Sequence, residues 1–316
     1  MQRTDLALAT ECCIRLLENV ERVIVEKRRV IQYTIAALMA GGHVLFQDVA
    51  GLGKTMLARA IAVSIGGRFR RLQFTPDLLP SDVTGVTVYN QRTGQFEFRP
   101  GPVFANVLLA DEINRASPRT QSALLEAMAE QQVTVDGVTY ELPRPFFVLA
   151  TQNPVETEGV YPLPESQLDR FMMRLRIGYP SAEAEREVVR RQLVQHPIER
   201  LGPVTTPDEV LRAQHAVAHC YVDDRIYNYA INIVRATRES PEVEVGASPR
   251  GSISLIKAAQ ALAVIQGRDY VTPDDIKEMA VPCLAHRLIL TAEARVRGIT
   301  AEYIVESLLH KVPVEV

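Results

Sequence analysis

Residues 47–55 constrain what this chain can fold into more than any other stretch, and they read Gln-Asp-Val-Ala-Gly-Leu-Gly-Lys-Thr. An apolar run at 44–46 precedes them, and a helix-like stretch at 56–65 follows. A buried strand, a glycine-bearing loop and a helix start, in that order, form the setting of a phosphate-binding loop. Glycines let backbone N–H groups turn toward one anion, and the helix N-terminus adds partial positive charge. The stretch therefore predicts a nucleotide site.

Three side chains of this stretch bear on the chemistry. In the usual pattern G-x-x-x-x-G-K-[ST], the lysine, here Lys54, reaches the β- and γ-phosphates, and the hydroxyl of Thr55 ligates Mg²⁺. Asp48 replaces the first glycine of the pattern. Two interpretations of Asp48 stay open, because its carboxylate could bond its own backbone and hold a turn, or repel the anion. An ordinary turn followed by a helix cap is the alternative interpretation of residues 51–55.

Composition and charge narrow the class of protein. The chain has 316 residues, of which 47% are hydrophobic and 23% charged, as in ordinary globular proteins. Its net charge of −3 gives no general field for polyanions, so we expect no nucleic acid as main ligand. Cys12, Cys13, Cys220 and Cys283 lack the spacing of a zinc site or a disulfide framework. The N-terminus has no signal-peptide form and no apolar run approaches ~20 residues, so we predict a cytoplasmic protein without membrane insertion.

Strand and helix patterns alternate up to residue 179. Three apolar runs are typical of strands buried on both faces of a parallel sheet, and they lie at 44–46, 107–110 and 146–150. Two pairs of alternating segments flank glycine-bearing links and predict hairpins, at 86–98 and 133–140. In the first hairpin we favour cross-strand packing of Tyr89, Phe96 and Phe98 over contact with a client protein.

After residue 180 every periodic segment is helical. Proline stands at or near the first position of several of these segments, where helices tolerate it best. The segments are 182–195, 207–220, 223–238, 249–266, 273–285 and 301–309. We therefore predict a three-layer αβα nucleotide-binding domain with a parallel core sheet over residues 1–179, and a smaller all-helical domain over residues 180–316.

Polar residues at two predicted strand ends carry the second part of the site. Asp111 and Glu112 directly follow the apolar run at 107–110. A carboxylate there can hold Mg²⁺, and Glu112 can polarise the attacking water. Asn153 follows the next buried strand, at the edge where open α/β sheets bind ligands, and can position water or touch the γ-phosphate. Acids where a strand reaches solvent, and a turn asparagine before proline, are the alternatives.

Two arginines are candidates for contact with the transferring phosphoryl group. Arg170 precedes an apolar segment that begins at Phe171, and its guanidinium could point at the nucleotide of a neighbouring subunit. A surface salt bridge with Asp169 or Glu165 is the alternative. Arg250 lies in the first turn of a predicted helix and could reach the phosphates across the cleft between the domains. A solvated helix start is nearly as good an interpretation.

The chain resembles the MoxR family of AAA+ ATPases over nearly its whole length. The strings that carry the resemblance are Phe-Thr-Pro-Asp-Leu-Leu-Pro-Ser-Asp at 74–82, Ala-Asp-Glu-Ile-Asn-Arg-Ala at 110–116, Ala-Thr-Gln-Asn-Pro at 150–154, Tyr-Pro-Leu-Pro-Glu-Ser-Gln-Leu-Asp-Arg-Phe at 161–171 and Gly-Ala-Ser-Pro-Arg at 246–250. The resemblance implies an AAA+ core at 1–179 and a helical lid at 180–316. It also implies a helix-2 insert hairpin at about 83–100 and a hairpin before sensor 1 at about 132–142.

The resemblance also assigns roles to residues. It implies Walker A and Walker B motifs, a sensor 1 residue, an arginine finger and a sensor 2 arginine. Glu112, Asn153, Arg170 and Arg250 would be catalytic, and Thr55 and Asp111 would hold Mg²⁺. The residues implied to bind ATP or ADP are Ile24, Val25, Ala50, Gly51, Leu52, Gly53, Lys54, Thr55 and Met56. The family assembles into rings, often hexamers, and acts as chaperone-like ATPases that remodel partner complexes. Many members work with proteins that carry von Willebrand factor A domains.

Three positions depart from the family pattern, and two other functions stay open. Asp48 stands for Gly, Ala50 for Pro and Glu26 for Gly, and we expect these changes to bear on nucleotide affinity and turnover. Asp48 motivates the first alternative, a nucleotide-gated scaffold with little turnover. The second is a DNA motor, which needs basic hairpin tips, whereas Arg92 is the one cation at the two tips.

Overall fold

The structure is a computed structural model that describes residues 2–155, 159–194 and 196–314. Within these residues, five parallel strands form the central sheet, in the order β2-β5-β8-β1-β9. The strands are β1 (Val44–Gln47), β2 (Phe69–Gln73), β5 (Val107–Asp111), β8 (Phe147–Gln152) and β9 (Met173–Leu175). Because all five are parallel, their carboxyl ends meet at one edge of the sheet, as the sequence predicted.

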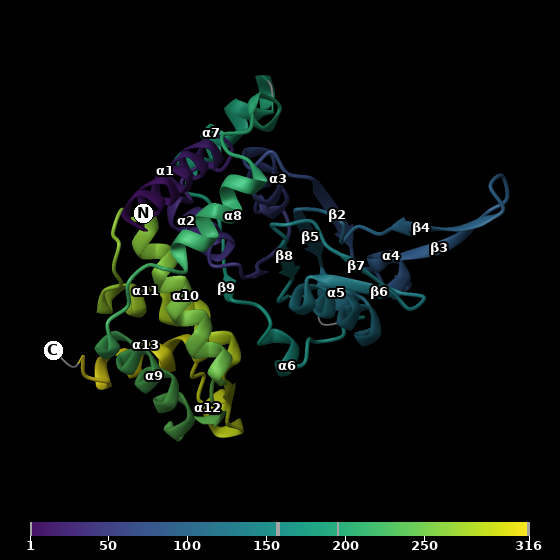
Figure 1. The fold of residues 1–316 in the computed structure, drawn as a ribbon. Helices are drawn as coiled ribbons and strands as arrows, with labels where there is room; N and C mark the ends of the chain where they lie inside the picture. Colours follow the sequence, from purple (N-terminus) through teal and green to yellow (C-terminus); the bar gives the residue numbers. More distant parts are fainter. Residues whose placement is uncertain (1, 156–158, 195, 315–316) are drawn as a thin grey trace.

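The sheet is the middle layer of three (Figure 1). Alternate residues of β5 and β8 face opposite sides of the sheet, and each side is covered by a hydrophobic cluster. Leu109 and Leu149 belong to the first cluster, and Leu108 and Val148 belong to the second. The helices of the first cluster are α1 (Gln2–Glu21), α2 (Arg28–Met39) and α3 (Lys54–Ser64). The second cluster contains α5 (Pro118–Glu130). Burial on both faces explains why β1, β5 and β8 read as continuous apolar runs.

Two hairpins lie where the sequence predicts them. They are β3 (Gly85–Asn90) with β4 (Gln95–Pro100), and β6 (Gln132–Val135) with β7 (Val138–Glu141). The second turns at Asp136 and Gly137, whose φ angles of 51° and 79° are the positive values that a two-residue turn needs. The first hairpin projects from the body (Figure 1), with the rings of Tyr89 and Phe96 5.3 Å apart and both exposed. Cross-strand packing of this pair is confirmed.

Short elements connect these parts. The link at 75–85 contains α4 (Pro80–Thr84), which starts at proline. The backbone N–H of Leu79, just before this helix, donates to the Asp82 carboxylate at 2.8 Å. Further along are the short helix α6 (Glu165–Leu168) and the 3₁₀ turn η1 (Ile113–Arg115). Both lie on the segments that carry candidate site residues.

The second half is helical except for a small ribbon that the sequence did not reveal. Its helices are α7 (Ala182–Val194), α8 (Pro207–Val217), α9 (Asp224–Glu239), α10 (Pro249–Ile265), α11 (Pro273–Leu284), α12 (Ala292–Val296) and α13 (Ala301–Lys311). The ribbon pairs β10 (Val243–Val245) with β11 (Ile289–Leu290), and the 3₁₀ turns are η2 (Pro197–Arg200) and η3 (Ala285–Arg287). Thr206, Ser248 and Thr272 cap α8, α10 and α11 with their hydroxyls, which explains the predicted proline starts.

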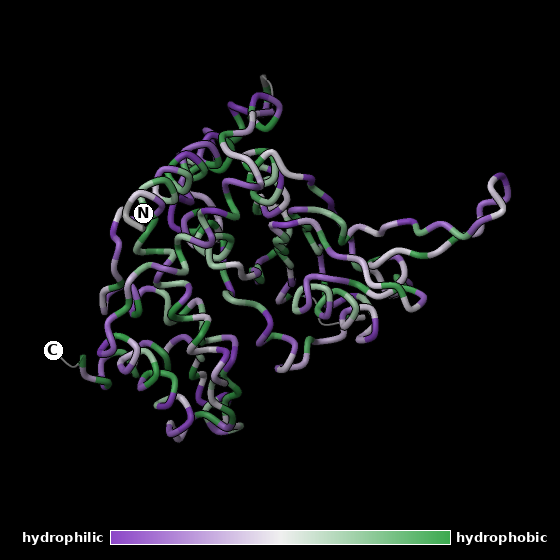
Figure 2. Tube along the Cα trace, in the orientation of Figure 1, coloured by the Kyte–Doolittle hydropathy of each residue, from purple (hydrophilic) through white to green (hydrophobic). Residues whose placement is uncertain are grey.

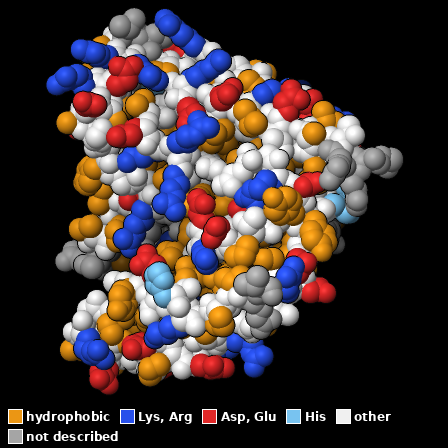
Figure 3. All heavy atoms as spheres, turned by 90° about the vertical axis from the view of Figure 1, so that its left-hand side faces the viewer, with side chains coloured by type: hydrophobic (Ala, Val, Ile, Leu, Met, Phe, Trp, Pro, Cys, Tyr) orange, Lys and Arg blue, Asp and Glu red, His pale blue; other side chains and the backbone are white. Residues whose placement is uncertain are grey.

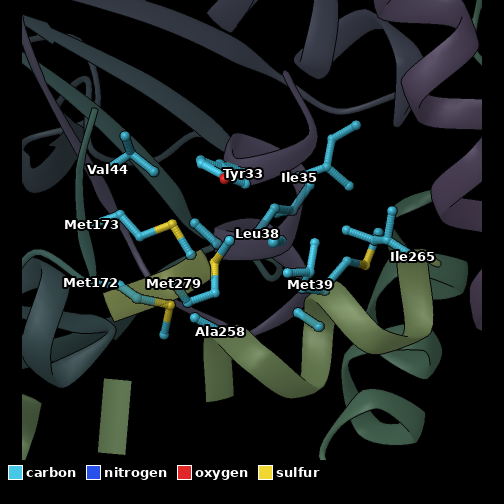
Figure 4. Close-up of a cluster of buried hydrophobic side chains, with 14 of the residues drawn as sticks. Tyr33, Ile35, Leu38, Met39, Val44, Met172, Met173, Ala258, Ile265 and Met279 are labelled. Carbon is cyan, nitrogen blue, oxygen red and sulfur yellow. The ribbon is translucent and has the colours of Figure 1, made fainter. Parts of the chain in front are cut away.

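The two halves share one hydrophobic cluster. Side chains of α1 and α2 pack against α8, α10 and α11. In Figure 4, Leu38 and Met39 of α2 meet Ala258 of α10 and Met279 of α11, and Met173 of β9 lies beside them. The division at residue 180 stays a prediction, and the helical half is anchored on the N-terminal helices rather than joined only through a linker.

The surface is mixed in character. The tube of Figure 2 is hydrophobic mainly inside the body and more hydrophilic at the tip of the projecting hairpin. On the face in Figure 3, lysines and arginines are interspersed with acids. In the part of the chain that the structure describes, no helix is long and apolar enough to cross a membrane. The four cysteines are free and buried, and burial raises the pKa of Cys220 and of Cys283 to about 12.

Candidate nucleotide site

The predicted phosphate loop connects β1 to α3. Gly51 and Gly53 have φ angles of 87° and 89°, which are left-handed values that other residues adopt only with strain. Gly53 is the N-cap of α3, so that Lys54 and Thr55 lie in the first helical turn. A loop followed directly by a helix N-terminus presents unpaired backbone N–H groups to an anion. The geometry is that of the predicted strand, loop and helix.

Lys54 is buried and held by the loop itself. Its ammonium donates to the carbonyl oxygens of Asp48 and Val49, each at 2.8 Å. Burial lowers the pKa of Lys54, and the carboxylates of Asp48, Asp111 and Glu112 act in the opposite direction. The loop follows β1 and the two acids follow β5, and both strands pair in parallel with β8, so the two motifs lie at one edge of the sheet.

Thr151, buried at the end of β8, orders the two acids. Its hydroxyl donates to the Asp111 carboxylate at 2.7 Å and accepts from the backbone N–H of Glu112 at 2.8 Å. Glu112 has a φ of 55°, an uncommon value for this residue type that is often found at functional sites. The sequence singled out both acids but gave no role to Thr151.

Residues of β2 also hold the acids, and the sequence analysis missed them. Arg71 donates to Asp111 at 2.6 Å, and the Gln73 amide donates to Glu112 at 2.7 Å. Arg115 pairs with Glu112 at 3.0 Å. Since β2 lies beside β5 with Gln73 opposite Asp111, the contacts of Arg71 and Gln73 follow from strand order, whereas Arg115 lies in η1, just after Glu112 in the chain. A short strand of sequence Phe-Arg-Arg-Leu-Gln gives no local sign of that order.

The oxygen donors fit a small divalent cation. The Thr55 hydroxyl starts α3 and the Asp111 carboxylate ends β5, and hard oxygen ligands of this kind suit Mg²⁺. Within residues 2–155, 159–194 and 196–314, no group of three His, Cys, Asp or Glu side chains could hold a metal ion. This agrees with the usual Mg²⁺ arrangement, in which phosphates and waters supply most of the ligands.

Asn153 directly follows β8, between the phosphate loop and the acids in the sheet order. Its side-chain oxygen accepts from the backbone N–H of Val155 at 3.3 Å. The β8 strand pairs with both β1 and β5. Asn153 therefore lies at the correct edge, and its sensor role stays a prediction.

A largely apolar pocket beside the loop contains six of the nine predicted nucleotide-binding residues. These are Ile24, Val25, Gly51, Leu52, Gly53 and Met56. The sequence did not anticipate the rest of its wall, which comes from the 177–180 segment, from α7 and from η2. Ala50, Lys54 and Thr55 belong to the adjoining loop and helix start. The pocket suits an adenine ring, because its walls are mostly apolar and residues 51–53 of the phosphate loop line it.

The two acidic departures from the family pattern both bind the segment that joins the halves. The Asp48 carboxylate accepts from the backbone N–H of Ile177, and from that of Gly178 at 3.4 Å. The Glu26 carboxylate accepts from the backbone N–H of Ser181 at 2.9 Å. Hydrogen bonding by the backbone and side chain of Ser181 lowers the pKa of Glu26. The interpretation that Asp48 bonds its own backbone was wrong, because the carboxylate bonds a backbone 129 residues away. The interpretation that it repels the anion stays a prediction.

We expect Asp48→Asn to lower the free energy of unfolding by about 1–3 kcal/mol, the cost of weakening buried, charge-assisted hydrogen bonds. An asparagine oxygen can accept from one N–H, but its amide nitrogen then faces the other donor. Urea unfolding of the variant, beside the exposed control Asp77→Asn, measures the difference. Equal unfolding midpoints for Asp48→Asn and wild type would contradict the role of this carboxylate.

Arg170 and Arg250 line a second pocket, together with Lys257 and the residues 41–43 that precede β1. Arg170 donates to the carbonyl of Leu125 at 2.6 Å, and its neighbour Asp169 pairs with Arg287 instead. The phosphate loop follows the other end of β1, a strand of four residues and about 13 Å. The structure puts Arg250 in one pocket with Arg170, beside the residues that precede β1, and its reach to the phosphates stays a prediction.

Comparisons with known proteins also point to a nucleotide-binding ATPase with a helical lid. Residues 43–173 match the model of the ATPase family associated with various cellular activities (AAA), and residues 235–308 match the AAA lid domain. The chain is 56% identical to an uncharacterised protein YeaC of Bacillus subtilis, with 95% of each chain covered. It is 42% identical to chaperone MoxR1 of Mycobacterium tuberculosis, over 97% of this chain and 83% of that one. A crystal structure of a candidate ATPase from Cytophaga hutchinsonii matches with a TM-score of 0.93 and 41% sequence identity, over 99% of this chain and 98% of that one.

Proposed function

The chain belongs to the MoxR family of AAA+ ATPases, and from that premise we propose that it hydrolyses ATP between neighbouring copies of itself. The hydrolysis would drive remodelling or maturation of partner protein complexes. One observation carries the proposal. The phosphate loop, Asp111 and Glu112 lie at the same edge of the sheet, whereas Arg170 and Arg250 share a pocket at the start of β1.

This separation is what an interface site requires. The arginines lie by the start of β1 and the phosphate loop follows its end, about 13 Å along the strand, so we expect them to face a neighbour's loop rather than their own. Closed rings are built from such head-to-tail contacts, in which one face of a subunit meets a different face of the next. A hexamer is the ring size that the family resemblance implies.

Each residue then has a chemical task. Backbone N–H groups of residues 51–54 would bind the phosphates, and Lys54 would exchange its two carbonyl partners for the β- and γ-phosphates. Thr55 and Asp111 would hold Mg²⁺, which would supply neutralising charge. Glu112 would take the proton of the attacking water, and Asn153 would orient that water.

The arginines complete the proposed site from the next subunit. Arg170 and Arg250 would approach the transferring phosphoryl group and stabilise the charge spread over its oxygens. The projecting hairpin offers Tyr89 and Phe96, 55% and 75% exposed, to a partner. A protein with a von Willebrand factor A domain is the partner class that the family resemblance implies.

Mass determination in solution tests the proposal together with phosphate release. We expect a monomer or small oligomer without nucleotide and a ring when ATP and Mg²⁺ are added, because bound triphosphate would join neighbouring subunits. Glu126→Gln, an exposed change on α5, is the control. A chain that stays monomeric at every ATP concentration and still hydrolyses ATP would refute the interface site.

One observation favours the alternative of a nucleotide-gated scaffold with little turnover. Both acids have protein partners, since Arg71 pairs with Asp111, and Gln73 and Arg115 bind Glu112. A Glu112 carboxylate held in this way is less available to water. Strong ATP binding without phosphate release, even with a partner protein present, would favour the scaffold.

A further inference from the structure

A buried ion pair joins the segment of Arg170 to the helical half. The Arg287 side chain is 2% exposed and donates to the Asp169 carboxylate at 2.7 Å. Arg287 also donates to the carbonyl oxygen of Phe171 at 2.8 Å and to the hydroxyl of Ser254 at 3.1 Å. A buried guanidinium persists only when it is paired and its N–H groups are satisfied. Arg287 therefore fixes the backbone on both sides of Arg170.

The same carboxylate holds the helix that bears the other arginine. The Ser248 hydroxyl donates to the second oxygen of Asp169 at 3.0 Å and accepts from the backbone N–H of Arg250 at 3.1 Å. Asp169 is thus bonded to the residue that caps α10, two positions before Arg250. One carboxylate ties together the two segments that carry the arginines.

The hydrogen bonds of Asp169 and Arg287 have no part in the proposed contact of the two arginines with the phosphoryl group. They are also not needed to hold the two halves of the chain together. Apolar contacts between the halves already form one cluster, and replacing a buried ion pair by apolar residues is often neutral or stabilising. What the ion pair adds is direction, since several charge-assisted hydrogen bonds from one planar guanidinium add geometric specificity as well as energy. A defined position matters where donors must meet the charge that develops in the transition state.

We propose that Asp169 and Arg287 are positioning residues that set Arg170 and Arg250 as one preassembled pair for the neighbouring subunit's triphosphate. The inference rests on the proposed function and deepens it. In this arrangement the helical half and Arg170 move together. A shift of the helical half would therefore move Arg170 relative to the nucleotide bound by the neighbouring subunit. A misplacement of about 1 Å at such a site costs ~10²-fold in rate.

The first test is Arg287→Lys, which keeps the charge and loses the forked geometry. We expect turnover to fall ~10²-fold, while ATP affinity stays within about twofold, because the network does not line the pocket beside the phosphate loop. Asp169→Asn repeats the test with the shape preserved, should Arg287→Lys fail to fold. A merely structural change would lower ATP affinity together with turnover.

The matched control is Arg268→Lys. Arg268 also pairs with a carboxylate in the helical half, in this case bidentately, with Asp275 at 2.6 and 2.7 Å. It follows the far end of α10, a helix of 17 residues and about 25 Å. We expect Arg268→Lys to lower the unfolding midpoint and to leave turnover at the wild-type level.

Mixed assemblies give the deciding readout. Glu112→Gln subunits have an inactive site of their own but intact arginines, and Arg287→Lys subunits have the reverse. Mixed in equal amounts, they should recover about a quarter of the wild-type rate, because one of four neighbour combinations unites two intact halves. Wild-type turnover in pure Arg287→Lys, or a loss that mixing does not restore, would overturn the inference. Absence of turnover in the wild type would instead overturn the proposed function, and the inference with it.

Discussion

Arg170→Ala is expected to bind ATP with wild-type affinity and to lose ~10³-fold or more of its turnover, the typical cost of removing an arginine finger. Binding should survive because Arg170 lies in the pocket at the start of β1, away from the loop that holds the phosphates. Turnover should fall because charge on the transferring phosphoryl group would lose its cationic partner. Steady-state phosphate release and nucleotide titration of the same preparation measure both quantities.

The control for this variant is Arg176→Ala. Arg176 lies six residues further on, with its side chain 66% exposed and 3.7 Å from Glu302, a geometry worth little energetically. It should leave both binding and turnover unchanged. Hydrolysis by Arg170→Ala at the wild-type rate would show that the arginine finger is another residue.

Much of the fold could be predicted because its signals are local. Residues 107–111 read as a buried strand ending in an acid, and residues 136–137 read as a two-residue turn. Each is decided by neighbours within a few positions, through burial on both faces or positive φ. The same holds for the loop at 48–53, whose glycines adopt the conformations that a phosphate loop needs.

The partners of the site residues could not be predicted, because they depend on which segments the fold brings together. Asp48 bonds the backbone of Ile177, and Glu26 that of Ser181, across 129 and 155 residues. The two departures from the family pattern therefore concern the segment between the halves as well as the nucleotide. The sequence shows only that Asp48 and Glu26 are acidic where glycine is usual, and it gives no sign of their partners.

The position of Arg250 in the fold also could not be predicted from the residues next to it in the sequence. Its helix start was predicted correctly from Ser248 and Pro249, but a helix start does not say which side of the sheet it faces. Packing of α10 against α2 decides this, and it puts Arg250 beside Arg170. Two arginines proposed separately from the sequence thus became one cluster in the structure.

Glu112→Gln is the second change with a large expected effect. We expect turnover to fall about 10²- to 10⁴-fold, the usual contribution of a general base, because an amide cannot take the proton of the attacking water. ATP binding should persist, since Lys54 and the loop N–H groups are untouched. The amide oxygen can still accept from Gln73 or Arg115, which now hold the carboxylate at 2.7 and 3.0 Å, so the fold should be retained.

This variant also separates the two candidate functions. If the chain is a hydrolase, Glu112→Gln should stay assembled long after ATP is added, because the triphosphate between the subunits is no longer cleaved. Wild type should disassemble as ATP is consumed, and Glu126→Gln should follow wild type. If all three proteins show the same lifetime of the assembly and the same phosphate release, Glu112 is not the base and the scaffold becomes the better account. A difference confined to Glu112→Gln would tie assembly to hydrolysis at this carboxylate.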